Sequence, residues 1–117
     1  MSKNLIDRIP RGEEFLLKDK IEYQEGGIAS LRLTYSKVVD ITLLAVYKGE
    51  KLQTHSADGD AFVQMLEGEA KITVDGVEHI LKEGDSILLP VSIPHSLEAI
   101  SSFKFLLTVV YPKALEE

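Results

Sequence analysis

Apolar and polar side chains alternate along much of this chain of 117 residues. In the segments 29–35 and 70–75, apolar residues occupy every second position. A period of two places successive side chains on opposite faces of an extended strand, so both segments predict half-buried strands. The segments 38–47, 77–81 and 103–111 are rich in apolar and β-branched residues and predict further strands.

Turn signals containing glycine separate these segments, and Asp75-Gly76 between two apolar runs is the strongest hairpin signal among them. Many short strands separated by such turns are typical of an all-β sandwich or barrel. Only the short stretches 6–14 and 113–117 could be helical. Because the chain shows no linker or change in composition, we expect a single domain.

The composition excludes several classes of protein. Hydrophobic residues make up 44% of the chain and there is no cysteine, which excludes disulfide scaffolds and thiolate metal sites. A net charge of −6 argues against nucleic acid as a partner. The apolar runs are too short for a membrane span and residues 1–10 lack a signal-peptide core, so we expect a cytoplasmic protein. Glu67 falls at the end of a predicted strand, where a solvated charge is expected.

Three histidines, His55, His79 and His95, are the first candidates for metal binding or acid–base chemistry. A two-residue turn at Asp75-Gly76 would pair His79 with Ile72, which favours a packed or edge histidine over a ligand. His95 follows a stiff turn over residues 90–94 that holds two prolines, and such a turn suits a binding site and a tight barrel corner equally well. Taken alone, the sequence around His55 predicts a surface residue.

The segments around His55 and His95 resemble the two motifs of the cupin superfamily, a family of small β-barrels. At the spacing of the first family motif the chain carries Gly49, His55, Ala57, Ala61 and Gly68. At the spacing of the second motif it carries Gly84, Pro90, Ser92, His95 and Ala99. The resemblance covers about residues 35–111 and implies a double-stranded β-helix, or jelly-roll barrel, which we expect over residues 27–117.

The departures from these motifs bear on function. A typical metal-binding cupin supplies three histidines and a carboxylate inside the barrel, and of these only His55 and His95 carry over. Ala57 stands at the position of the second histidine and Ala61 at that of the carboxylate. Since alanine offers no lone pair to a cation, the resemblance implies a degenerate metal site that would hold a divalent metal only weakly.

We therefore expect an apolar pocket for a small molecule inside the barrel. Strand alternation places Val63 and Met65 on the same side as Ala61 and turns Asp60 outward. The expected ligand-binding residues are His55, Ala57, Ala61, Val63, Met65 and His95, with contributions from Leu88, Phe103 or Phe105. The alternatives are a metal-dependent enzyme of dioxygenase or isomerase type that uses His55 and His95, and a structural or interaction module.

The N-terminal segment, residues 1–26, is more apolar than an exposed edge would be. Its apolar side chains are Phe15, Leu16, Leu17, Ile21 and Tyr23. Exposed strand edges invite pairing with another chain. We therefore expect a homodimer in which strands of this segment pack on the sheet of the neighbouring copy.

Overall fold

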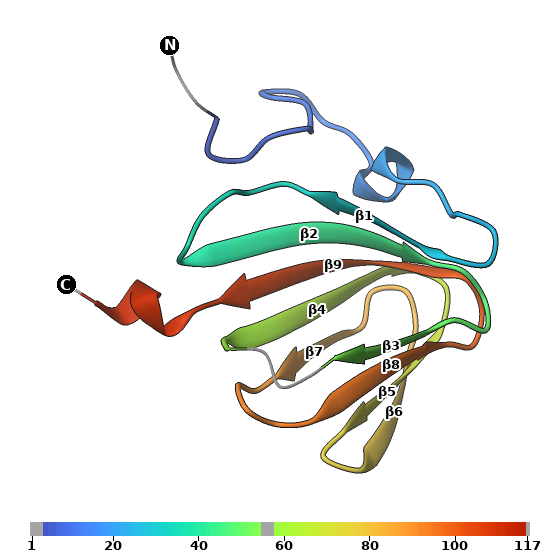
Figure 1. Cartoon of the computed structure of the whole chain (residues 1–117). Coiled ribbons are helices and arrows are strands. Elements are labelled where there is room, and N and C mark those ends of the chain that lie inside the picture. Colours follow the sequence, from blue (N-terminus) through green and yellow to red (C-terminus); the bar gives the residue numbers. More distant parts are fainter. Residues whose placement is uncertain (1–3, 55–57, 117) are drawn as a thin grey trace.

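Two antiparallel sheets pack face to face in the computed structural model, which describes residues 4–54 and 58–116 (Figure 1). In the described residues, one sheet has the strand order β1-β2-β9-β4-β7 and the other β3-β8-β5-β6. The strands are β1 (Ile28–Arg32), β2 (Val39–Val46), β3 (Lys51–Thr54), β4 (Asp60–Glu67), β5 (Ala70–Val74), β6 (Val77–Leu81), β7 (Ser86–Leu89), β8 (His95–Ala99) and β9 (Phe103–Val110). This is the predicted all-β jelly roll.

The core lies between the inner faces of the two sheets. On β4, Ala61, Val63 and Met65 are buried while Asp60 is exposed, so the predicted alternation is confirmed. The rings of Phe103 and Phe105 stack with their centroids 5.4 Å apart at one end of β9. Successive inward residues from facing strands therefore build one continuous apolar layer.

Leu88 does not contribute to this layer. The register of β4 with β7 pairs Ala61 with Leu89 and Phe62 with Leu88. Because directly opposite residues share a face, Leu89 is buried and Leu88 is 53% exposed. The expectation that Leu88 lines the pocket is therefore wrong, because the inward position belongs to the next residue, Leu89.

The hairpin between β5 and β6 forms as the sequence predicts. Asp75 and Gly76 have φ angles of 49° and 81°, the left-handed values of a two-residue type I′ turn. The turn sets Ile72 opposite His79, as expected. His79 is exposed on β6, the last strand of its sheet, so of the two expected alternatives it is an edge histidine and not a packed one.

The N-terminal segment runs across the outer face of the five-stranded sheet of its own chain (Figure 1). Ile21 is buried against Leu43 and Ala45 of β2, with Leu17 and Tyr23 packed beside it. The segment contains the 3-10 helix η1 (Leu17–Lys20) and no strand among its described residues, so the expectation of strands there is wrong.

The helical expectations are met at one end of the chain only. The stretch 6–14 forms bends and no helix, whereas the 3-10 helix η2 (Pro112–Leu115) overlaps the second predicted stretch and begins one residue before it. Of the helices in the described ranges 4–54 and 58–116, neither has the length and apolar character needed to cross a membrane.

A polar cluster fixes the N-terminal segment to the sheet. The Tyr23 hydroxyl donates to Glu67 Oε2 at 2.5 Å, and Lys104 Nζ donates to the Lys18 carbonyl at 2.7 Å. Burial, together with the hydrogen bond to Glu67, raises the pKa of Tyr23 above its ordinary value of 10.0. Glu67 is therefore a structural acceptor, not the solvated strand end that its sequence position suggests.

Candidate functional site

A cavity of about 340 Å³ lies between the two sheets. Its described lining has nine apolar residues and two polar ones, and no charged side chain among them. The lining residues are Leu44, Leu52, Gln53, Ala61, Val63, Leu89, His95, Leu97, Phe105, Leu107 and Val109. A concave, mainly apolar site with few polar groups is the usual form of a small-molecule pocket, and such pockets span about 300–1,000 Å³.

Both sheets contribute to this cavity. The larger sheet supplies residues of β2, β4, β7 and β9, and the smaller sheet supplies residues of β3 and β8. Ala61 lies between its register partners Leu89 and Val109, and all three line the cavity. A methyl group between two larger neighbours leaves space that a longer side chain would occupy, so Ala61 helps to keep the barrel hollow.

His95 is the polar side chain that the chain holds most firmly at this cavity. It is the first residue of β8, and only 8% of it is exposed. Its ring Nδ1 lies 3.0 Å from the Ile93 carbonyl oxygen, a bond in which the nitrogen donates. In the neutral ring this bond assigns the lone pair to Nε2.

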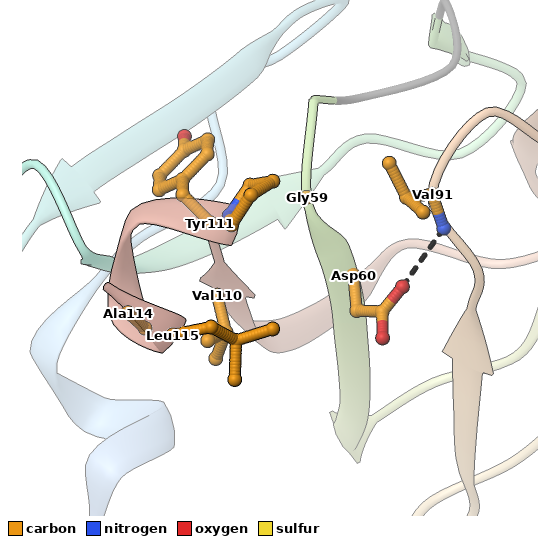
Figure 2. A pocket seen from close by; sticks show the side chains of 8 residues that line it. Gly59, Asp60, Val91, Val110, Tyr111, Ala114 and Leu115 are labelled. Carbon is orange, nitrogen blue, oxygen red and sulfur yellow. Dashed lines mark hydrogen bonds between the residues drawn. The ribbon is translucent and has the colours of Figure 1, made fainter. Parts of the chain in front are cut away.

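The turn before His95 is held by a carboxylate (Figure 2). Asp60 Oδ1 accepts a hydrogen bond from the backbone N–H of Val91 at 2.9 Å. Within the same turn, Ile93 N–H donates to the Pro90 carbonyl at 3.3 Å. Asp60 points away from the core, as expected, and it positions the turn that leads into His95.

Asp60 also lines a second depression, of about 270 Å³, on the surface beside η2 (Figure 2). Its apolar lining includes Val91, Val110 and Leu115. This depression is separate from the cavity between the sheets, because the two share no lining residue.

The structure brings half of the predicted ligand-binding residues to the cavity. Ala61, Val63 and His95 line it, together with Phe105. Met65 and Phe103 are buried in the same core but do not line the cavity. His55 and Ala57, the remaining predicted residues, lie outside the described part of the chain.

Several residues that line the cavity were not predicted from the sequence. Leu107 and Val109 share the inward parity of Phe105 on β9, so the alternation already identified there could have found them. Gln53 lies two residues before His55, so alternation along the strand could have found it as well, whereas Leu44 had no such signal. Leu44 belongs to a nearly continuous apolar run, and Gln53 is exposed and reaches the cavity from an edge strand.

The described residues do not supply the donor set of a metal centre. Within the ranges 4–54 and 58–116, no group of three or more histidine, cysteine, aspartate or glutamate side chains is close enough to hold an ion. Ala61 and Ala99, at two of the family's motif positions, are both buried. Buried methyl groups at these positions offer a cation no oxygen or nitrogen.

The paired sheets and the hollow core define a small β-barrel protein with an interior large enough for a ligand. The family model described as Cupin domain matches residues 42–111, which is more than half of the chain. The chain therefore belongs to the cupin family, as the motif spacing indicated.

Solved structures similar to the chain agree with this assignment. A conserved protein of unknown function from Streptococcus pyogenes is 32% identical, with a TM-score of 0.91, and the match covers 96% of this chain and 98% of that one. A cupin superfamily protein from Desulfitobacterium hafniense is 27% identical, with a TM-score of 0.87 and coverages of 91% and 97%.

A Cupin 2 conserved barrel domain protein from Leptotrichia buccalis is 44% identical, with a TM-score of 0.79. The match covers 82% of this chain and 47% of that protein, so this chain spans about half of its length. A comparison with curated proteins found no match.

Proposed function

We propose that the chain binds a small, mainly apolar molecule in the cavity between its sheets. The observation that carries this proposal is the cavity of about 340 Å³, whose described lining is apolar except for Gln53 and His95. Its volume lies near the lower end of the usual range of about 300–1,000 Å³, which favours a compact ligand such as a single substituted ring.

The lining also favours uncharged ligands over anionic ones. No lysine or arginine lines the described cavity, so a buried carboxylate on the ligand would have no permanently charged partner there. An uncharged ligand does not incur that penalty. We therefore expect neutral phenol-like or alcohol-like molecules to bind more tightly than the matching acids.

The alternative of a metal-dependent dioxygenase or isomerase requires donors that the described residues do not provide. Of the two proposed ligands, His95 faces the cavity and His55 lies outside the described part. A single histidine beside buried apolar groups supports binding of an organic ligand better than metal chemistry. Metal analysis of untagged protein separates the two, because the enzyme alternative requires bound divalent metal that is lost in His95→Ala.

The binding proposal is tested with a matched pair of probes, 4-methylphenol and 4-methylbenzoate, titrated into the protein and followed by NMR chemical shifts. We expect the phenol to bind at least tenfold more tightly, which corresponds to about 1.4 kcal/mol. Shifts should be largest for backbone amides of the lining residues on β4, β8 and β9. Equal or stronger binding of the carboxylate would contradict the proposed charge selection.

Two variants with the same substitution locate the binding site. Ala61→Val adds two methyl groups to the cavity wall and should weaken 4-methylphenol binding at least tenfold. Ala114→Val adds the same groups on η2, where Ala114 is exposed and outside this cavity, and should leave binding unchanged. If both variants bind like the original protein, the ligand does not occupy the cavity between the sheets.

A further inference from the structure

The N-terminal segment covers only part of the outer face of the five-stranded sheet. It packs on β2, where Ile21 is buried against Leu43. Toward the other edge of this sheet, the outward residues Phe62 of β4 and Leu88 of β7 lie directly opposite each other and are 38% and 53% exposed. Large apolar side chains that stay exposed side by side indicate a contact surface.

This apolar surface continues into the depression beside η2 (Figure 2). Asp60 lies two residues before Phe62 on β4, so both side chains point to the same, outer face. Val110 lies opposite Asp60 on β9, and both Val110 and Val91 are exposed. We call the combined surface the β4 surface, and its residues are Asp60, Phe62, Leu88, Val91, Val110 and Leu115.

Defined backbone bounds the depression on two sides. A Cβ at Gly59 would collide with the Val110 carbonyl oxygen, so only glycine allows the start of β4 to approach the end of β9 this closely. On the opposite side, η2 begins with Pro112, and the Ala114 N–H donates to the Tyr111 carbonyl at 2.9 Å. The depression is therefore held open by the packing of β4, β9 and η2.

The depression combines apolar walls with one negative charge. Asp60 is the only charged residue in its described lining. Asp60 Oδ1 accepts the Val91 N–H at 2.9 Å. Because a carboxylate has about four lone-pair sites on its two oxygens, this bond leaves room for a further donor.

A long cationic side chain has the complementary chemistry. Arginine buries its hydrocarbon stem along apolar surface while its charged head stays beside water or a carboxylate. The guanidinium is planar and weakly hydrated, and its N–H donors match the geometry of a carboxylate. The volume of about 270 Å³ lies below the usual range of about 300–1,000 Å³ for small-molecule pockets, which favours the insertion of one side chain.

We propose that the β4 surface docks a segment of another protein that presents one arginine between apolar residues. The arginine enters the depression, with its stem against Val91 and Leu115 and its guanidinium beside Asp60. Its apolar neighbours contact Phe62 and Leu88, which a free amine in the depression would not reach. The apolar surface beyond the depression therefore favours a protein segment over a small cation, and arginine is among the residues that contribute most at interfaces.

Two peptides that differ in one charge test this proposal. They are acetyl-Leu-Arg-Leu-amide and the same peptide with citrulline, an uncharged residue of nearly the same shape, in place of arginine. In NMR titrations of the full chain at low ionic strength, we expect the arginine peptide to bind about threefold more tightly, because exposed ion pairs contribute little. The difference should disappear at high salt, and the largest shifts should fall on the amides of Phe62, Leu88 and Val91.

A pair of isosteric variants tests the role of the carboxylate. Asp60→Asn removes the charge and retains an oxygen that can accept the Val91 N–H, so the turn should be kept. The two peptides should bind this variant equally. Asp58→Asn is the matched control, because Asp58 is also exposed but lies outside the depression, and it should keep the preference for arginine. An unchanged preference in Asp60→Asn, or none in the original protein, would overturn the proposal.

The apolar part of the contact separates a protein segment from other occupants. Phe62→Ser should weaken binding of the arginine peptide about threefold and leave binding of butylguanidinium, which occupies the depression alone, unchanged. Leu88→Ser provides a second variant with the same expectation, and Ile80→Ser, at an exposed position of the other sheet, should have no effect. If neither Phe62→Ser nor Leu88→Ser weakens peptide binding, the occupant is a small cation and the proposal is wrong. Shifts of the same amides with protein concentration alone would show that a second copy covers this surface, which would also overturn it.

Discussion

Replacing Ser92 by glycine should stabilise the fold, because Ser92 holds its backbone at a φ of 67° in the left-handed region. This residue lies in the turn before His95, at the position where the cupin motif has a glycine. Its side chain is exposed and makes no hydrogen bond within the described part of the chain. The serine side chain therefore offers no contact to offset the strain.

The size of the effect follows from two opposing contributions. A side chain with a Cβ costs about 1–2 kcal/mol in the left-handed conformation. Glycine loses about 0.5–1 kcal/mol because its unfolded chain is more flexible. The net gain is about 0.5–1 kcal/mol, which for 117 residues at about 2.1 cal/mol/K each raises Tm by about 2–4 °C.

Thermal unfolding followed by circular dichroism measures this change, and urea unfolding provides an independent free energy. Ser86→Gly is the matched control, because Ser86 is an exposed serine on the extended strand β7. This control should lose about 0.5–1 kcal/mol, since only the unfolded-state contribution applies there. If Ser92→Gly and Ser86→Gly destabilise the protein equally, the left-handed strain at Ser92 is not significant.

Two further predictions concern the N-terminal contact and a tight turn. Tyr23→Phe removes the hydrogen bond to Glu67 and should cost about 1–2 kcal/mol in urea unfolding at pH 7. The pKa of Tyr23 is raised in the folded protein, so the stability that its hydroxyl contributes is complete below the ordinary pKa of 10.0 and is lost as the pH rises above that value. Above pH 10 the free energy of unfolding of the original protein should therefore fall more steeply than that of Tyr23→Phe. Gly68→Ala should cost about 3 kcal/mol or more by circular dichroism melting, because the new Cβ would collide with the Ser102 carbonyl in addition to a φ of 83°. Gly84→Ala, with a φ of 89° but open space around it, should cost only about 1–2 kcal/mol.

Local patterns were sufficient to predict most of the barrel. Alternation predicts β1 and β5, and the turn at Asp75-Gly76 predicts the register of the hairpin that follows. The N-terminal segment was harder, because a run such as Phe15 to Tyr23 fits an edge strand and a segment packed across a sheet equally well. The hydrogen bond between Tyr23 and Glu67 joins residues 44 positions apart, a separation that no local pattern predicts.

The lining of the cavity was predictable only where the alternation of side chains along a single strand, or the motif spacing, identifies an inward position. Ala61 and His95 were identified by the spacing of the cupin motifs, and Val63 because it lies on the same face of one strand as Ala61. Leu88 failed because parity across β4 and β7 depends on register, which the sequence of β7 alone does not define. The prediction that Met65 lines the cavity was wrong, because alternation along a strand shows which side chains point into the core but not where in the core the cavity lies.

The motif positions that this chain retains and those it has changed serve different physical purposes. Gly68 and Gly84 keep φ angles of 83° and 89°, and Ser92 adopts 67° even without a glycine, so the turns of the barrel are preserved. Ala61, at the position of the family's carboxylate, offers a metal no oxygen. Because a carboxylate at position 61 would be buried among apolar neighbours at high cost, a methyl group at this position suits the proposed binding of an uncharged ligand.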